Sequence, residues 1–130
     1  LKPADYEGFS QLLDSLYQKL CQFIVLKSGN DMCSILIDEI EWVEAVNRQV
    51  VFNLVDGKKL EVRDTFNNIQ NKLLLYPGFF KPHRSYIVNF KHVEHFNTKE
   101  IFMRGSKLSI PLARGLDKEF KDKYFSFMFS

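Results

Sequence analysis

The stretch FFKPHRSYIVN, residues 79–89, decides the fold of this chain. Its aromatic and β-branched residues are typical of a strand, and Pro82 fixes the backbone in front of a polar group. We expect Ile87 and Val88 to face the two sides of that strand. The side chains with directional hydrogen-bonding groups are His83, Arg84, Ser85 and Asn89. Such groups suit phosphate oxygens or the edges of bases, so the stretch predicts a surface that binds an anion.

The net charge of +2 conceals an asymmetry along the chain. Residues 1–78 carry eight Lys and Arg against eleven Asp and Glu, a balance of −3, whereas residues 79–130 carry ten against five, a balance of +5. The basic half therefore begins at the stretch quoted above. One interpretation is an ordinary solvated surface. The other is a face that neutralises phosphates, with an affinity that falls as salt rises.

Length and composition favour one ordinary domain with an accessory element, because 130 residues with 45% hydrophobic content can form a packed core. The sequence contains no apolar run long enough for a bilayer and no signal peptide, so we expect a soluble, cytoplasmic protein without a membrane partner. Its start at Leu1 rather than Met leads us to expect a piece of a longer protein. Cys21 and Cys33 have neither pairing logic nor metal-ligand spacing and are expected to be reduced thiols.

The first part of the chain changes its hydrophobic period at residue 23. Residues 5–22 have apolar side chains at helical spacing, which predicts an amphipathic helix capped by Asp5. The expected hairpins that follow pair residues 23–26 with 32–37, 42–46 with 49–54, and 50–55 with 59–63. Their turns are rich in Gly, Asn and Asp, and the Asp56-Gly57 pair is the strongest short turn signal of the chain.

The second part is predicted to contain one short helix, more strands and a final helix. Thr65 or Asp64 caps the short helix, which turns Phe66, Ile69 and Leu73 inward. After the strand of residues 79–91 come a hairpin of residues 92–96 with 101–104, a last strand at 107–112, and a helix from Gly115 with an apolar tail at 125–129. The fold class is therefore mainly β, with short antiparallel strands, one short internal helix, and an N-terminal and a C-terminal helix.

The motif HRSYIVN at residues 83–89 closely resembles the signature of the LytTR-type DNA-binding domain, the effector half of many bacterial response regulators. The flanking stretches DEIEWVE at 38–44 and IPLAR at 110–114 agree with it in order and spacing. The resemblance implies a LytTR-type domain at residues 23–130. Residues 1–22 would be the last helix of a truncated receiver domain, in which Lys2 is the lysine that contacts the phosphorylated aspartate. The alternative is a helix that simply packs on the β domain; the receiver interpretation predicts a helix-mediated dimer or swapped packing.

The same resemblance implies that loops between strands enter successive major grooves of DNA. The residues it assigns to base contacts are Asn47, Arg48, Gln49, Arg84 and Arg114, and which of the first three reaches a base stays open. Each such contact is worth roughly 1–3 kcal/mol of discrimination. The residues assigned to the DNA backbone are Lys81, His83, Ser85, Asn89, Lys91, Arg104 and Lys107, where the first four either contact phosphate or brace the loop. Ala113 departs from the family, which usually has Ser or Thr before the last arginine.

Catalysis is not expected. His92 and His95 would lie on opposite faces of a strand, and no phosphate loop or nucleophile motif appears, so we expect no cofactor, metal or small-molecule substrate. The predicted function is sequence-specific binding of double-stranded DNA at direct-repeat promoter sites, as a homodimer, with an upstream receiver domain and a sensor histidine kinase as partners in a two-component phosphorelay. The alternative is a small β-rich protein-interaction module without DNA binding, which thirteen Phe in 130 residues would favour.

Overall fold

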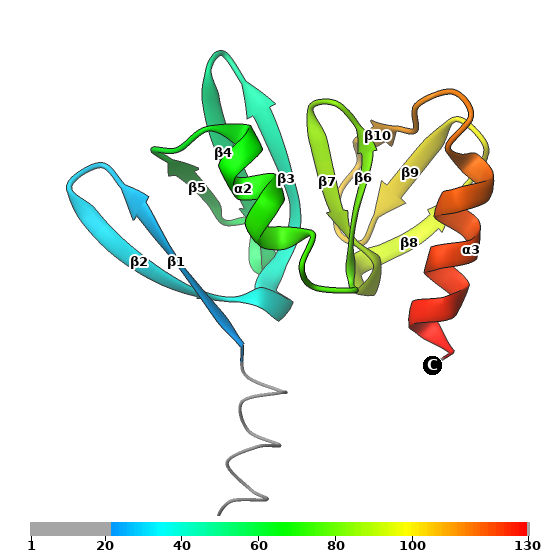
Figure 1. Ribbon diagram of the computed structural model, residues 1–130, viewed down its shortest axis with the longest axis horizontal. Helices are drawn as coiled ribbons and strands as arrows, with labels where there is room; N and C mark the ends of the chain where they lie inside the picture. Colours follow the sequence, from blue (N-terminus) through cyan, green and yellow to red (C-terminus); the bar gives the residue numbers. More distant parts are fainter. Residues whose placement is uncertain (1–21, 130) are drawn as a thin grey trace, which may run out of the picture.

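The computed structural model describes residues 22–129, so the predicted N-terminal helix and Lys2 lie outside the described residues. Within that range the chain forms ten β-strands in three sheets, together with two α-helices (Figure 1). The expected mainly-β class, with one short internal helix and a C-terminal helix, is confirmed.

The largest sheet is antiparallel and has the strand order β5-β4-β3-β7-β6. Its strands are β3 (Ile40–Val46), β4 (Gln49–Leu54), β5 (Lys59–Val62), β6 (Phe79–His83) and β7 (Tyr86–Asn89). The two smaller sheets are the hairpin β1 (Phe23–Ser28) with β2 (Asp31–Leu36), and the order β10-β9-β8 built from β8 (Val93–Phe96), β9 (Glu100–Met103) and β10 (Ser109–Pro111). The final strand is thus shorter than the sequence predicted.

Helices cover the sheets and connect them. The 3-10 helices are η1 (Ile37–Glu39), η2 (Val55–Gly57) and η3 (Phe90–His92), and the α-helices are α2 (Phe66–Leu73) and α3 (Asp117–Met128). The hydroxyl of Thr65 accepts a hydrogen bond of 3.2 Å from the backbone N–H of Asn68, which confirms the predicted N-cap of α2. The last helix was expected to begin at Gly115 and to end in the apolar tail at residues 125–129; α3 begins two residues later and continues to Met128, so the helical end of the chain is confirmed.

The stretch at residues 79–91 is a hairpin and a 3-10 turn rather than one strand. β6 ends at His83, Arg84 and Ser85 form the turn, and β7 runs back beside β6 with Phe80 opposite Val88. Pro82 cannot donate a ladder hydrogen bond, and the pairing is irregular between Phe80 and His83. The prediction of one continuous strand was wrong because hydrophobic content alone does not reveal a two-residue turn.

Two hydrophobic clusters share the β6–β7 hairpin as a wall. The first packs α2 and the β1–β2 hairpin against the five-stranded sheet and includes Phe79 and Ile87. The second packs α3 and the β8–β10 sheet against the other side of the hairpin and includes Phe80 and Val88. The expectation that Ile87 and Val88 face opposite sides is confirmed. Packing on both faces positions the hairpin, and with it the Arg84-Ser85 turn.

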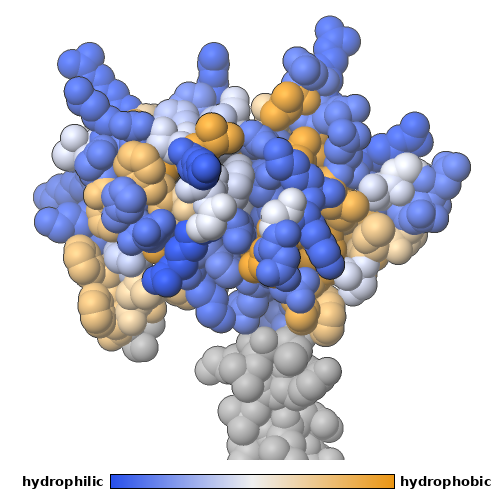
Figure 2. All heavy atoms as spheres, turned by 180° about the vertical axis from the view of Figure 1, so that it is seen from behind, coloured by the Kyte–Doolittle hydropathy of each residue, from blue (hydrophilic) through white to orange (hydrophobic). Residues whose placement is uncertain are grey.

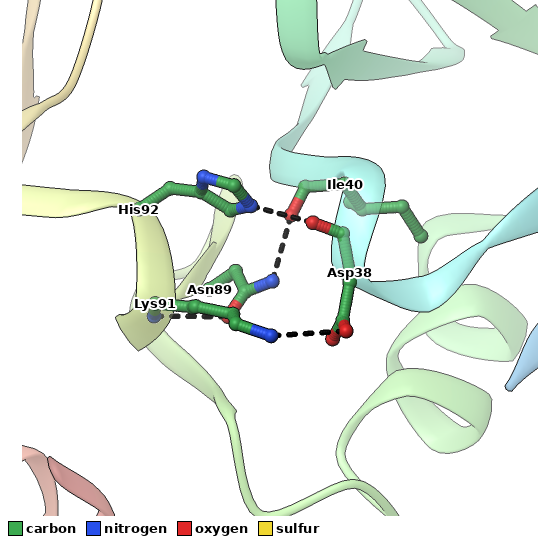
Figure 3. Close-up of polar contacts among 5 residues, drawn as sticks. All are labelled: Asp38, Ile40, Asn89, Lys91 and His92. Atoms are coloured by element: carbon green, nitrogen blue, oxygen red, sulfur yellow. Dashed lines mark hydrogen bonds and ion pairs between the residues drawn. The ribbon is translucent and has the colours of Figure 1, made fainter. Parts of the chain in front are cut away.

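A polar network ties η1 to η3 between the two clusters (Figure 3). The buried Asn89 side chain donates a hydrogen bond of 2.9 Å to the carbonyl of Ile40. His92 contributes a ring nitrogen, Nε2, at 2.6 Å from the carbonyl oxygen of Asp38; since a carbonyl only accepts, this nitrogen carries the proton. Lys91 forms an exposed ion pair of 2.9 Å with the Asp38 carboxylate. These contacts join residues about fifty positions apart in sequence.

Candidate nucleic-acid interface

Two turns of the five-stranded sheet lie at the same end of it. β3 runs toward this end and β4 away from it, with Asn47 and Arg48 between them, while β6 and β7 meet there at Arg84 and Ser85. The backbone N–H of Ala45 donates a hydrogen bond of 2.9 Å to the carbonyl of Ser85, which ties the two turns together. We call this end of the sheet the turn edge; it is uppermost in Figure 1.

The segment that follows β10 reaches the same edge. The backbone N–H of Ala113 donates a hydrogen bond of 2.7 Å to the carbonyl of Pro82 in β6, two residues before Arg84 begins the β6–β7 turn. Arg114 follows directly, and Figure 1 shows the segment between β10 and α3 at the upper edge of the fold. Three segments far apart in sequence therefore bring Arg48, Arg84 and Arg114 to one edge.

The β3–β4 turn has a conformation that normally favours glycine. Asn47 has φ 47° and Arg48 has φ 66°, and two positive-φ central residues are the mark of a type I′ hairpin turn. Asparagine tolerates this region, whereas arginine pays a steric cost on the order of 1 kcal/mol. Arg48 is exposed, so its side chain stands at the tip of the hairpin without any packing that would require it. Such strain at an exposed tip motivates the hypothesis that Arg48 is a functional residue.

The arginines of this chain differ from its lysines in their contacts. All five arginines are exposed, and within residues 22–129 none takes part in an ion pair. Three of the lysines in the same range, Lys72, Lys91 and Lys123, pair with carboxylates. The arginines at the turn edge therefore present unneutralised guanidinium groups, the donor that matches phosphate and guanine in a two-pronged geometry. Seen from behind, the upper edge carries a row of projecting hydrophilic side chains (Figure 2).

Lys81, His83 and Ser85, which lie in or beside the β6–β7 turn, make contacts inside the protein. The ring nitrogen Nδ1 of His83 accepts a hydrogen bond of 3.2 Å from the backbone N–H of Ser85, and the ring packs edge-on against Tyr86 at 5.7 Å. His83 therefore braces the turn. The Lys81 ammonium donates a hydrogen bond of 2.6 Å to the Gln70 side chain on α2, so its charge is directed toward that helix.

Asn89 does not reach the surface. Its side chain is only 3% exposed, its amide nitrogen donates to Ile40, and its amide oxygen accepts a hydrogen bond of 3.1 Å from the backbone N–H of Lys91. Both ends of the amide are thus occupied inside the protein. The assignment of Asn89 to a phosphate contact is corrected to the other role allowed for it, that of bracing residue.

The remaining predicted backbone contacts lie away from the turn edge. Lys91 is in η3, and the backbone N–H of Arg104 donates a hydrogen bond to the carbonyl of His92 at the end of η3. Lys107 lines a hollow of about 520 Å³ together with Asp56 and Glu41. Burial raises the pKa of the Glu41 carboxyl. Asp56 follows β4 at the end opposite Gln49, about 17 Å away along the strand. The structure does not bring these three basic residues to the turn edge.

Arg63 is a basic residue at the turn edge that the sequence interpretation missed. In the pairing of β4 with β5, Val50 lies opposite Val62, so the next position brings Arg63 beside Gln49. Counting outward from a two-residue Asp56-Gly57 turn would place Arg63 opposite Val50, but the connection spans Val55–Gly57, which shifts the register by one position and brings Arg63 opposite Gln49. Arg63 was overlooked because it follows a strand rather than sitting in a two-residue turn.

Fold and edge together define a class of protein: a small, mainly-β nucleic-acid-binding domain that presents arginines on strand turns. The family model described as the LytTr DNA-binding domain matches residues 30–124, and the chain belongs to this family. The family is defined by DNA binding rather than by catalysis. None of the described helices is long and apolar enough to cross a membrane, and residues 22–129 contain no cluster of metal-ligating side chains.

A comparison with solved structures gives the same fold. The chain resembles the LytTr DNA-binding domain of a Bacillus cereus protein described as a methyl-accepting/DNA response regulator, with a TM-score of 0.62 and 17% sequence identity. The match covers 78% of this chain and 94% of the other. No curated protein sequence matched the chain.

Proposed function

We propose that this domain binds double-stranded DNA in a sequence-specific manner and thereby regulates transcription. The observation that carries the proposal is the convergence of Arg48, Arg84 and Arg114 on one edge, each exposed and without an ion pair among the described residues. No helix is needed to read the bases, because strand turns also fit the major groove, which is about 12 Å wide.

The three turns divide the work of recognition. Arginine forms two hydrogen bonds to guanine, and asparagine or glutamine forms two to adenine, so Arg48, Arg84, Arg114 and the flanking Asn47 and Gln49 are the base-reading set. Ser85 and the exposed backbone of the turns contact phosphates and fix the register. Ala113 has no hydroxyl, so the segment before Arg114 contributes no side-chain contact to phosphate.

We also infer a larger assembly, which the description of one relative supports. The Bacillus cereus relative is described as part of a response regulator, and we infer that this domain is likewise the effector of a two-component regulator. Its partners would be an upstream receiver domain, a sensor histidine kinase and a second copy of itself on direct-repeat sites in successive major grooves. Dimerisation strengthens binding because the second domain binds at a high effective concentration.

A selection experiment tests the proposal directly. The chain is mixed with a pool of random duplex DNA at two salt concentrations, and the retained DNA is sequenced. Recovery of a discrete motif, with retention that weakens steeply as salt rises, is the expected result. Retention without a motif would leave only a nonspecific basic surface, and no retention at low salt would refute DNA binding by this chain.

Matched arginine variants separate base reading from general attraction. Arg84→Ala and Arg114→Ala should lower affinity for the selected site by about 1–3 kcal/mol and lower affinity for random DNA less. Arg104→Ala is the control, because it removes the same exposed group from the opposite end of the fold. Equal losses on selected and random DNA would show that Arg84 and Arg114 contact only phosphates.

A second candidate function, docking of another protein, has one observation in its favour. Apolar side chains gather at the C-terminal end of α3, seen at the lower left of Figure 2, where Phe125 stacks on Phe129 and Phe129 is 79% exposed. Leu75, before β6, is 82% exposed. This surface lies away from the turn edge, so it does not compete with DNA. A binding activity that ignores salt and survives Arg84→Ala would belong to it.

A further inference from the structure

We propose that the DNA interface extends beyond the three turns to a fourth point, where Arg63 contacts a backbone phosphate next to the bases read by the β3–β4 turn. The inference rests on the proposed DNA binding and adds a contact that neither the motif nor the turn chemistry assigns. The observation that supports it is that Arg63 lies beside Gln49, at the same end of the neighbouring strands β5 and β4.

Strand pairing fixes where Arg63 lies. Val46 pairs with Gln49 across the β3–β4 hairpin, and Val50 pairs with Val62 across β4 and β5. Adjacent strands are about 4.8 Å apart, so the backbone of Arg63 lies one strand away from Gln49, on the side opposite the Arg84 turn. A duplex that reaches both turns therefore extends toward Arg63 along the same edge.

The surroundings of Arg63 have room for a phosphate group. Ser28, Gly29, Gln49, Glu61 and Val62 line a hollow of about 420 Å³ with it. Gly29 has open space on the side where a Cβ would stand, and the Ser28 side chain supplies a hydroxyl. The backbone N–H of Arg63 donates a hydrogen bond of 2.8 Å to the carbonyl of Lys27, which holds the end of β5 against β1.

The charges around the hollow are not balanced internally. Arg63 is exposed and, among residues 22–129, pairs with no carboxylate, although Glu61 lines the same hollow. Glu61 lies in β5 and Arg63 directly follows that strand, so the two side chains are only two positions apart, yet they form no ion pair. Because Arg63 is unpaired, all of its guanidinium donors are available to a phosphate. The carboxylate of Glu61 repels the same phosphate and therefore weakens the contact.

The experiment measures binding of the whole chain to fluorescently labelled duplexes over a series of salt concentrations. One duplex carries a site recovered from the random pool and the other is a scrambled sequence. Arg63→Ala should weaken both complexes by a similar factor, on the order of tenfold at low salt, and should reduce the salt slope by about 0.9. Arg63→Lys should restore most of the slope, because it restores the charge.

Two further variants make the result specific to this hollow. Glu61→Gln should strengthen binding to both duplexes, since it removes a charge that repels phosphate, whereas Arg104→Ala should change neither. Circular dichroism confirms that each variant is folded; Arg63→Gln replaces Arg63→Ala if that variant unfolds.

The outcomes separate this inference from the proposed function. If Arg63→Ala leaves affinity and salt slope unchanged while Arg84→Ala loses the selected site, the fourth contact is refuted and DNA binding stands. If Arg63→Ala weakens only the selected site, the residue reads bases and the phosphate assignment is wrong. If the unmodified chain binds neither duplex at low salt, the proposed function itself fails.

Discussion

From the strained β3–β4 turn we predict that one substitution, Arg48→Gly, both stabilises the protein and impairs DNA binding. Asn47 and Arg48 both have positive φ, and the sequence that fits such a type I′ turn best is Asn-Gly. Arg48→Gly creates that pair without touching any packed residue, because Arg48 is exposed at the hairpin tip. Its effects on stability and on binding should therefore have opposite signs.

The expected magnitudes follow from the turn geometry. An L-residue in the left-handed region costs about 1–2 kcal/mol, and glycine loses about 0.5–1 kcal/mol more conformational entropy on folding. The net gain for Arg48→Gly is then about 0–1.5 kcal/mol, or up to about 10 °C in melting temperature for a domain of this size. Loss of a two-pronged base contact costs about 1–3 kcal/mol, so affinity for the selected site should fall about 5- to 150-fold.

The assay pairs thermal unfolding with DNA binding and uses a control from the opposite end of the sheet. Asp56 has φ 66° in another exposed turn, so Asp56→Gly places glycine at a positive-φ position far from the proposed interface. Because aspartate tolerates this region better than arginine does, Asp56→Gly should change the melting temperature little and leave site preference unchanged. A lower melting temperature for Arg48→Gly would refute the strain argument. Unchanged preference for the selected site would remove Arg48 from the base-reading set and leave Asn47 or Gln49 in that role.

Two more predictions concern stability alone. Asn89→Ala removes the partners of the buried Ile40 carbonyl and the part-buried Lys91 N–H, and it should cost about 1–3 kcal/mol of unfolding free energy in denaturant titrations. Lys91→Ala, which breaks an exposed ion pair, should cost under about 1 kcal/mol. A folded Asn89→Ala variant with weaker DNA binding at low temperature would contradict the bracing role. The hydrogen bond from the Asn68 side chain holds the pKa of the Asp64 carboxyl below its usual range. This stabilisation is present above the pKa of Asp64 in the unfolded chain and is lost as pH falls through its pKa in the folded protein. Asp64→Asn should therefore reduce the loss of unfolding free energy on acidification. If the variant loses as much stability at low pH as the unmodified chain, the role of Asp64 is refuted.

The hairpins could be predicted from the sequence because their turns carry their own chemistry. Asp56-Gly57 and Asn47-Arg48 are local signals, and the strands on either side of them were found nearly to the residue. The β6–β7 hairpin was missed because Arg84-Ser85 lacks the glycine or asparagine that marks a two-residue hairpin turn. The turn is held by His83 and by the tertiary hydrogen bond from Ala45. Local preference was overridden there by packing.

Side-chain direction was harder to predict than residue type. Asn89 has the groups of a DNA contact, yet it is buried at the junction of η1 and η3, a placement that depends on contacts with residues about fifty positions away. Arg104 and Lys107 were chosen for their charge and lie at the other end of the fold. Arg63 was passed over, although the strand register places it beside Gln49. For a sheet edge, strand register therefore indicates which residues lie together, and charge alone does not.

The arrangement of the two hydrophobic clusters explains why the signature coincides with the turn edge. Successive residues of the β6–β7 hairpin alternate between the clusters, so Phe79 and Ile87 belong to one, and Phe80 and Val88 to the other. A hairpin packed on both faces has little freedom to tilt, so the backbone at its tip is held by both cores at once. The β3–β4 tip has only a short turn to position it, and there the backbone itself is constrained by two positive-φ residues. The backbone of the tip is thus positioned by packing in one turn and by local conformation in the other.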